Sequence, residues 1–334
     1  MRGGAQTPGT DFKSVPAPPG ARGVALVTVL LVLAILSAIV GRLSFSNQVW
    51  IRQVGNGADF LQSALAVRAV QDWAGLILDE DDRAYDSFQD AWAQTPAPLP
   101  VGRGFVRGYG EGMEDMQARI NLNNLVQENR VNAQARKTLE QLLRILELNP
   151  GIAQAIVDWM DTGGDVYGPW GAEDGYYLGM NPPYVTANKP LNDPAELRLV
   201  RGVDRKVWYK LRPHVSALPP DVKKININTA SREVLAAVLT SLGLAQAQAL
   251  MKAEQLRGKA RQEPFKSQKD IQDYCKMEQL TPDCETLKQL LDVKTEFFLA
   301  HTLVETGNAR RRTATLYKRA EDGVSVRGHW REYD

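Results

Sequence analysis

The sequence has almost no excess of charge of either sign and few histidines. Its 334 residues carry 40 Lys and Arg against 39 Asp and Glu. This balance argues against nucleic acid as the main partner, since a dedicated nucleic-acid-binding domain usually has a basic excess. The three histidines, His214, His301 and His329, lie in different segments, and none has a metal-ligand partner at helical spacing. No P-loop, nucleophile elbow or Rossmann glycine pattern occurs, so we predict that the chain is not an enzyme.

One long apolar run is present, GVALVTVLLVLAILSAIVG at residues 23–41, and it contains no charged residue. Arg22 and Arg42 flank it. At about 1.5 Å per residue, a helix of this length just crosses a hydrocarbon core of about 30 Å. We therefore predict a single membrane helix.

The residues before this run are basic, rich in Pro and Gly, and free of apolar runs. A secretory signal peptide is cleaved after its apolar core, whereas here the favoured cleavage point, Gly23, comes before it. A basic leader, a glycine and an apolar helix resemble the class III leader of type IV pilins and pseudopilins. This resemblance implies cleavage after Gly23 by a prepilin peptidase and methylation of Val24 as the new N-terminus. The alternative is an ordinary single-pass signal anchor.

The fifth mature position departs from the pattern of most of that family. Counting Val24 as the first residue, Thr28 stands where most members have Glu. A charge at the centre of a membrane helix costs about 2.5 to 3.5 kcal/mol, so that Glu is retained only because it meets the N-terminal amine of a neighbouring subunit. Thr28 cannot form that ion pair. Among type II secretion pseudopilins, the K subunit lacks this Glu, which implies a position at the filament tip.

The apolar helix is predicted to continue as an amphipathic one. Apolar residues recur at steps of three and four, which favours a helix with one apolar face that packs on a sheet over about Asp59 to Leu78. That stripe consists of Val54, Ala58, Leu61, Leu65, Ala69, Trp73 and Leu76. Gly55 and Gly57 each cost about 1 kcal/mol in a helix interior, so we expect a bend or loosening there. The acidic run 79–82 is expected to end the helix in solvent.

The charges around the apolar run also predict the compartment. Arg2, Lys13 and Arg22 place the leader in the cytoplasm by the positive-inside rule, although Arg42 and Arg52 on the far side weaken the bias. The rest of the chain is then outside the inner membrane, in the periplasm of a Gram-negative bacterium. In an oxidising compartment, the close pair Cys275 and Cys284 is most simply a disulfide. Two unrelated buried thiols are the alternative.

Alternating segments predict an antiparallel sheet in two distant parts of the chain. Short strands are expected near 104–122, and KTEFFLAHTLVE and the two segments after it read as a meander over 294–334. The motif ARINLNNL, residues 118–125, resembles the point where K-type pseudopilins leave the pilin fold. The predicted fold is α+β: a pilin-like N-terminal helix on an antiparallel sheet, with a large inserted all-α domain of the helix-hairpin-helix or SAM-like type.

The middle of the chain is predicted to be helical. Residues 131–148 form one clear helix, and three further stretches place a single Gly and an aliphatic residue before an apolar-faced helix, around 148–160, 199–211 and 241–251. With KININTAS at 224–231, where Asn228 and Thr229 are expected to cap the next helix, this resembles a helix-hairpin-helix fold. The DNA-binding version grips phosphate through a Gly-x-Gly hairpin. Each hairpin here has only one Gly, which favours a shared helical scaffold without the phosphate grip. A membrane-anchored DNA-uptake protein is the alternative function.

Residues 158–177, DWMDTGGDVYGPWGAEDGYY, form an acidic loop with no Lys or Arg from 150 to 188. Crowded carboxylates repel one another unless a cation compensates. Oxygen ligands on a flexible backbone suit calcium, and zinc is disfavoured because the loop has no His or Cys. From charge alone, calcium and a plain solvated loop are equally supported. The string resembles the calcium loop of K-type pseudopilins, which implies that Asp161, Asp165, Glu173 and Asp174 are ligands, with Asp158 less certain because it was expected to face outward.

Together these features resemble type II secretion minor pseudopilins of the K type. The resemblance implies a leader at 1–23, a transmembrane part at 24–41, pilin-like parts at 42–125 and 294–334, and a helical insertion at 126–293. It also implies a role in capping the pseudopilus tip and initiating its assembly. The expected partners are the H, I and J minor pseudopilins and the prepilin peptidase, with secreted substrates and the outer-membrane secretin as further candidates.

Overall fold

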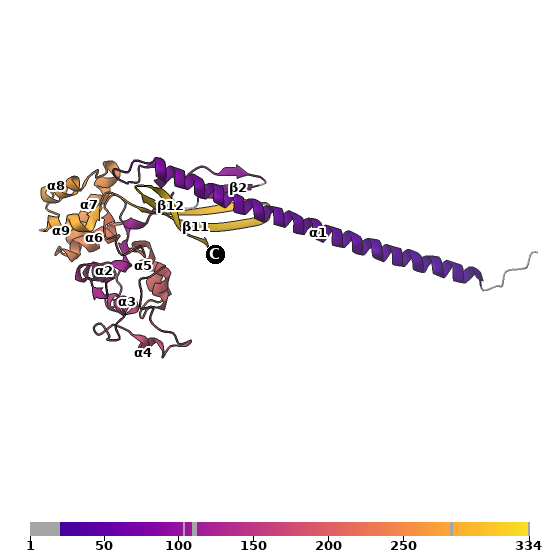
Figure 1. Ribbon diagram of the computed structural model, residues 1–334, viewed down its shortest axis with the longest axis horizontal. Helices are drawn as coiled ribbons and strands as arrows, with labels where there is room; N and C mark the ends of the chain where they lie inside the picture. Colours follow the sequence, from indigo (N-terminus) through magenta and orange to yellow (C-terminus); the bar gives the residue numbers. More distant parts are fainter. Residues whose placement is uncertain (1–20, 103, 109–111, 281–282, 333–334) are drawn as a thin grey trace, which may run out of the picture. The chain divides into compact units, whose positions relative to one another are not determined.

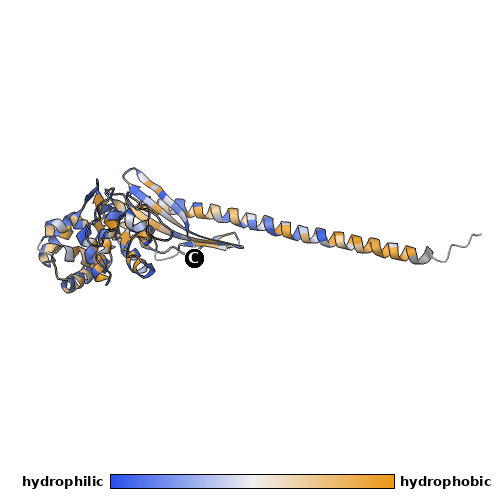
Figure 2. Ribbon diagram, turned by 90° about the horizontal axis from the view of Figure 1, so that it is seen from below, coloured by the Kyte–Doolittle hydropathy of each residue, from blue (hydrophilic) through white to orange (hydrophobic). Residues whose placement is uncertain are grey.

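A computed structural model describes residues 21–102, 104–108, 112–280 and 283–332, so most of the predicted leader lies outside the described residues. The first element is a single helix, α1 (Ala21–Glu80). Its first part is almost continuously hydrophobic (Figure 2). The helical hydrogen-bonded conformation continues through Gly55 and Gly57. Residues up to Asp59 form one compact unit, and residues from Phe60 form a second.

The second unit contains a six-stranded antiparallel sheet. Its order is β1 (Leu99–Val101), β2 (Gly104–Gly108), β10 (Phe297–Thr306), β11 (Ala309–Ala320) and β12 (Gly323–Glu332), and β3 (Glu114–Asp115) also pairs with β10. The predicted meander is therefore confirmed, and it completes a sheet that begins near residue 100 (Figure 1). Everything between β3 and β10 is inserted into this one sheet.

The C-terminal part of α1 packs on one face of the sheet, but not through the predicted stripe. The buried residues of this part are Ser63, Ala66, Val67, Ala74 and Leu78. Ala66 and Val67 cluster with Val304 of the sheet. Ala74 and Leu78 cluster with Phe298, Ala300 and Tyr317. The predicted stripe from Leu61 to Leu76 is exposed instead. The predicted stripe was wrong because the neighbouring face, with Ala66, Ala74 and Leu78, packs on the sheet instead.

The insertion is mainly helical and has its own core, in which Leu139, Ile156 and Leu235 are fully or almost fully buried. Its helices are α2 (Ala133–Ile145), α3 (Ile152–Met160), α4 (Asp174–Tyr177), α5 (Arg205–Leu211), α6 (Arg232–Ser241), α7 (Gln246–Gln262), α8 (Gln268–Met277) and α9 (Cys284–Leu290). The 3-10 turns are η1 (Ala91–Ala93), ahead of the insertion, and η2 (Met116–Ala118), η3 (Leu122–Asn124), η4 (Pro194–Leu199) and η5 (Arg212–His214). The remaining strands are β4 (Ile120–Asn121), β5 (Val126–Gln127), β6 (Arg130–Val131), β7 (Val215–Ser216), β8 (Ile225–Asn226) and β9 (Leu291–Asp292).

Local signals explain where these helices begin. Asn132 and Asp204 cap α2 and α5, each by accepting a hydrogen bond from a backbone amide of the first turn. Ser231 caps α6, and not Asn228 or Thr229 as predicted. Cys275 of α8 and Cys284 of α9 form a disulfide, with their Cα atoms 5.9 Å apart.

The two Asn-rich motifs, residues 118–125 and 224–231, are largely buried and connect distant segments of the chain. We call them the first and the second Asn-rich joint. Asn121 donates its side-chain amide to the carbonyls of Pro219 and Val222, and Asn123 exchanges hydrogen bonds with the backbone of Leu191. Asn228 does the same with the backbone of Phe265. Because each carboxamide replaces a missing backbone partner for a loop far away in the chain, these motifs hold the insertion together and fix it to the sheet.

A buried carboxylate lies at the centre of the second joint. Asp115, at the end of β3, accepts hydrogen bonds from the backbone amide of Gln117 and from the side chains of Asn226, Thr229 and Thr295. These residues belong to the sheet edge, to the KININTAS motif and to the segment that leads into β10. Burial raises the pKa of Asp115, and the hydrogen bonds from Thr229 and Thr295 oppose that rise.

Candidate functional site

The outer face of α1 within the second unit is apolar and uncovered in this chain. We define it by Leu61, Leu65, Ala69, Trp73 and Leu76, which are all exposed. Leu65 is 71% exposed, Leu61 66% and Leu76 57%. Their spacing of three and four residues places them in one line along the helix. Exposed apolar side chains in such a line are typical of a face that another molecule covers.

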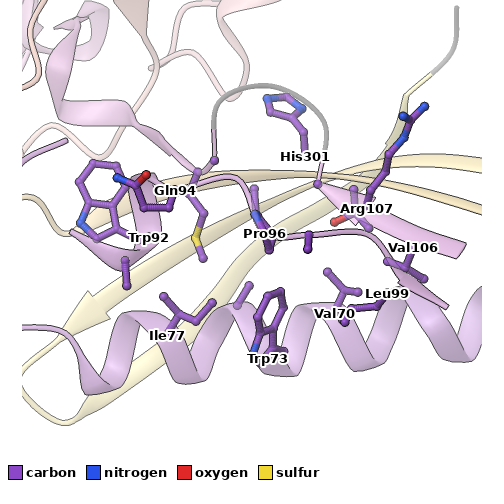
Figure 3. A pocket seen from close by; sticks show the side chains of 18 residues that line it. Val70, Trp73, Ile77, Trp92, Gln94, Pro96, Leu99, Val106, Arg107 and His301 are labelled. Atoms are coloured by element: carbon purple, nitrogen blue, oxygen red, sulfur yellow. The ribbon is translucent and has the colours of Figure 1, made fainter. Parts of the chain in front are cut away.

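An apolar groove of about 350 Å³ lies beside this face. Trp73 and Ile77 of α1 form one wall, while Trp92 and Pro96, from the segment after α1, lie opposite them (Figure 3). Leu99 lines it near Val70. Since Trp73 belongs to both, the groove and the α1 outer face form one continuous apolar surface.

The acidic loop is closed by a carboxylate that faces inward. Asp158, in the last turn of α3, is fully buried, and its two oxygens lie 3.0 and 3.2 Å from the backbone nitrogen of Tyr167, which donates to them. The expectation that Asp158 points outward was therefore wrong. A side chain at Gly171 would meet Asp158 Oδ2 at 2.2 Å, so only glycine fits there. Burial raises the pKa of Asp158 to about 6.

The four predicted ligands occupy different environments. Asp161 follows α3 and accepts a hydrogen bond from the amide of Gly163, and Asp165 is exposed. Asp174 accepts hydrogen bonds from the amide and hydroxyl of Thr186, and these hold its pKa below the ordinary value. The four carboxylates are not gathered into one compact set. Among the described residues, three carboxylates with oxygens within 4.8 Å of one another occur only at 81, 86 and 90.

Glu173 is the most unusual group of the loop. Its side chain is buried, and Oε1 has no hydrogen-bond partner. Burial raises its pKa to about 7, and the negative charges of Asp158, Asp161 and Asp174 add to the rise. A buried oxygen without a donor is costly unless a cation or a water meets it. This observation fits a cation-binding role for Glu173, with Asp161 and Asp158 as its electrostatic neighbours.

A second acidic cluster is formed by Asp81, Asp86 and Asp90. Arg319 of β11 donates to Asp81 at 3.0 Å and to Asp86, and it also donates to the carbonyl of Thr295. Burial raises the pKa of Asp86 to about 7, although the Arg319 charge opposes this. Because a buried guanidinium already occupies the cluster, we assign it a structural role, holding the segment after α1 against β11. The alternating pattern of β11 could not predict this cluster, because Arg319 meets carboxylates more than 230 residues away in the chain.

The start of α5 does not suit phosphate binding. Asp204 accepts a hydrogen bond from the amide of Val207 at the start of α5, so a carboxylate stands where an anion would bind. Asn226, Asn228 and Thr229 of the KININTAS motif are buried and hydrogen-bonded. These contacts leave the motif without the exposed amides that the DNA-uptake alternative requires.

Known proteins identify the family. The family model for type II secretion system protein K matches the chain at residues 118–220 and 225–294. The type II secretion system protein K of Aeromonas hydrophila is 31% identical over 325 residues, covering 91% of this chain and 95% of that protein. The protein K of Pseudomonas aeruginosa is 32% identical over 319 residues, covering 91% and 90%. The chain belongs to the type II secretion system protein K family.

A solved structure agrees with the fold of this protein K. It is the crystal structure of the GspK-GspI-GspJ complex from the enterotoxigenic Escherichia coli type 2 secretion system, with a TM-score of 0.71, 24% identity, and coverage of 84% of this chain and 100% of that chain. The predicted architecture, a long N-terminal helix with an antiparallel sheet and a helical insertion, is confirmed. The two family matches begin at Ala118 and Ile225. These are positions within the two Asn-rich joints.

The N-terminal helix of this protein K carries the membrane signal. By length and composition, α1 can cross a membrane. The hydroxyl of Thr28 donates to the carbonyl of Ala25, 2.9 Å away in the same helix. Thr28 therefore satisfies its polar group without a partner subunit.

Proposed function

We propose that this protein K is a minor pseudopilin that caps the tip of the pseudopilus and helps to initiate its assembly. The observation that carries the proposal is the α1 outer face, an apolar stripe that this chain leaves open along the helix by which pseudopilins associate. Thr28 supports the tip position, because its hydroxyl is bonded within its own helix and it offers no carboxylate to the amine of a subunit ahead. The proposed role is mechanical and not catalytic.

The proposed partners are other minor pseudopilins. The similar solved structure is a complex of GspK with GspI and GspJ, and we extend that association to this chain, with an H-type subunit as a further partner. Prepilin peptidase would cleave the leader. Secreted substrates and the outer-membrane secretin are the partners proposed for the insertion, and no nucleic acid is expected.

We place the second unit in the periplasm, with α1 anchored once in the inner membrane of a Gram-negative bacterium. The basic leader favours the cytoplasmic side for the N-terminus. The disulfide between Cys275 and Cys284 fits an oxidising compartment for the rest of the chain.

Leu65→Arg tests the α1 outer face. Because Leu65 is 71% exposed, the change should alter the free energy of unfolding by no more than about 0.5 kcal/mol. It should weaken association with the I and J subunits at least about ten-fold, since a charge would have to be buried in the interface. Co-purification of the complex from membranes and quantitative pull-down would measure this.

Met251→Arg is the matched control, because Met251 is 65% exposed on α7, away from α1. It should leave both stability and co-purification unchanged. Equal loss of the partners in both variants, or full retention in Leu65→Arg, would rule out this face as the docking surface.

We also propose that calcium binds in the acidic loop and holds it in one shape. Asp161, Asp165, Glu173 and Asp174 would supply oxygen ligands, and the buried, unpartnered Oε1 of Glu173 is the observation that supports this. When bound, calcium would neutralise carboxylates that otherwise repel one another.

Calcium is expected to raise the melting temperature of the full chain in detergent by several degrees. At a calcium concentration of about 100 times the dissociation constant, the gain in stability is about 2.7 kcal/mol. Glu173→Gln should abolish this gain, while its melting temperature without calcium should stay equal or rise, because a repelled charge is removed. Glu254→Gln, on the exposed side of α7, should keep the gain. If calcium left the melting temperature of the wild-type chain unchanged, the calcium proposal would be wrong and the segment would be a solvated loop.

A further inference from the structure

A second surface lies on the face of the sheet opposite α1. There a cleft of about 720 Å³ separates the strands from the insertion, a volume within the range of ligand-binding clefts. Its apolar lining comes from both sides. Leu299, Ala314 and Leu316 belong to β10 and β11. Met116 comes from η2, and Leu218 from the segment after β7. We call this the sheet cleft.

Two tryptophans stand at the sheet cleft. Trp330 of β12 is 41% exposed, and Trp208 of α5 is partly buried. They come from the edge strand and from the insertion, so the cleft has an aromatic ring on each side. Tryptophans at the edge of an apolar cleft are typical anchors for a bound protein segment.

The rim of the sheet cleft carries two exposed arginines. Arg212 and Arg327 line it from opposite sides, and neither forms an ion pair with any described residue. Arg205 and Arg212 lie over the ring of Tyr209, with guanidinium carbons 5.6 and 4.8 Å from its centre. Lys206 and Lys210 extend the positive surface along α5. Exposed positive side chains of α5 and η5 therefore lie beside the cleft.

The two carboxylates that line the cleft are already engaged. Glu114 is paired with Arg119 and with His301. Burial alone would raise the pKa of Glu114, but the His301 hydrogen bond and the nearby charges hold it at about 2. Asp193 accepts a hydrogen bond from the amide of Ala195 and caps η4. Neither Glu114 nor Asp193 is therefore a free counter-charge for Arg212 and Arg327.

From this arrangement we infer that the sheet cleft binds an acidic segment of another protein whose large apolar side chains enter the cleft between Trp208 and Trp330. The carboxylates of the segment would pair with Arg212 and Arg327. A protein segment is favoured over a nucleic acid because the floor is aliphatic, and because Glu114 and Asp193 would face a phosphate backbone. This surface is on the face opposite α1, so it does not depend on the proposed pseudopilin assembly.

The test measures peptide binding to the full chain in nanodiscs of uncharged phosphatidylcholine. The probe is a fluorescein-labelled twelve-residue peptide of repeating Glu-Phe-Glu-Leu, followed by fluorescence anisotropy. The double variant Arg212→Glu with Arg327→Glu should weaken binding about ten-fold or more, and Trp330→Ala should weaken it about five-fold. Trp330→Phe should restore most of the affinity. Circular dichroism melting of each variant would verify that the fold is kept.

The controls distinguish peptide binding in the sheet cleft from nonspecific electrostatic attraction. Arg261→Glu with Lys269→Glu makes the same charge change at exposed positions that do not line the cleft, and it should leave binding within about two-fold. A Glu-Ser repeat peptide and a Lys-Phe-Lys-Leu repeat peptide should bind much more weakly. Absence of binding by the Glu-Phe-Glu-Leu probe, equal loss in the control variant, or tighter binding of a twelve-nucleotide oligo-dT with the same sensitivity to Arg212 and Arg327 would overturn the inference.

Discussion

Replacing Asp115 with alanine is expected to lower the free energy of unfolding by about 3 to 5 kcal/mol. The carboxylate is almost fully buried and accepts five hydrogen bonds, two from backbone amides and three from side chains. Alanine would leave these donors buried without partners and would open a small cavity. The melting temperature should fall by on the order of 10 °C. Thermal unfolding of the full chain in detergent, followed by circular dichroism, measures the effect.

The conservative variant Asp115→Asn should give an intermediate loss. The asparagine oxygen can still accept from the amides of Gln117 and Ala118, and its NH₂ group can donate to the hydroxyls of Thr229 and Thr295, which can reverse their roles. The amide of Asn226 would then face another donor. The order wild type, Asn, Ala is therefore expected.

Asp193→Ala is the control for Asp115→Ala. It also removes a carboxylate that accepts backbone hydrogen bonds, but at an exposed helix cap. The expected cost is about 1 kcal/mol. If the two alanine variants lost equal stability, the Asp115 joint would not hold the insertion to the sheet as we describe.

Replacing Gly23 with leucine is expected to abolish removal of the leader. The proposed cleavage is directly after Gly23, and a leucine side chain would stand at the scissile bond where the leader pattern has none. In a host with a functional type II secretion system, intact-mass measurement of the purified wild-type chain should give a protein that begins at Val24. The variant should retain residue 1 and fail to support secretion.

Gly41→Leu is the matched control for the leader. It is the same substitution in the same helix, and an added side chain there meets no other atom within 4 Å. Its leader should be removed normally. A wild-type chain that began at Met1, or beyond the apolar run, would contradict the proposed maturation, as would normal processing of the Gly23 variant.

The elements that could be predicted correctly depend on residues close together in the chain. The strands of the meander were predicted from their alternating pattern and the turn residues between them. The helix predicted over 131–148 corresponds to Ala133–Ile145, because its cap and its apolar spacing lie within the segment itself. The acidic loop was recognised from composition. Its inward carboxylate, Asp158, was not, because the donor that holds it, Tyr167, is nine residues away and is fixed only when the loop is folded.

Two parts of the site depended on contacts that sequence patterns do not record. Periodicity found an apolar stripe on α1, but the sheet covers the neighbouring face, where Ala66 and Ala74 allow close approach. Large side chains such as Leu65 therefore remain outside. Asn228 of the KININTAS motif was predicted to cap the next helix, yet Asn226 and Asn228 bond to segments more than 35 residues away.

The sequence by itself determined the membrane helix, the strand meander, the family and the acidic character of the loop, because each depends on composition or on residues close together in the chain. Tertiary structure decided which face of α1 is free for a partner, which carboxylates are buried, and where cations remain unpaired beside the sheet cleft. These depend on which surfaces meet when the insertion closes on the sheet, and a surface becomes a docking site only when the fold leaves it uncovered.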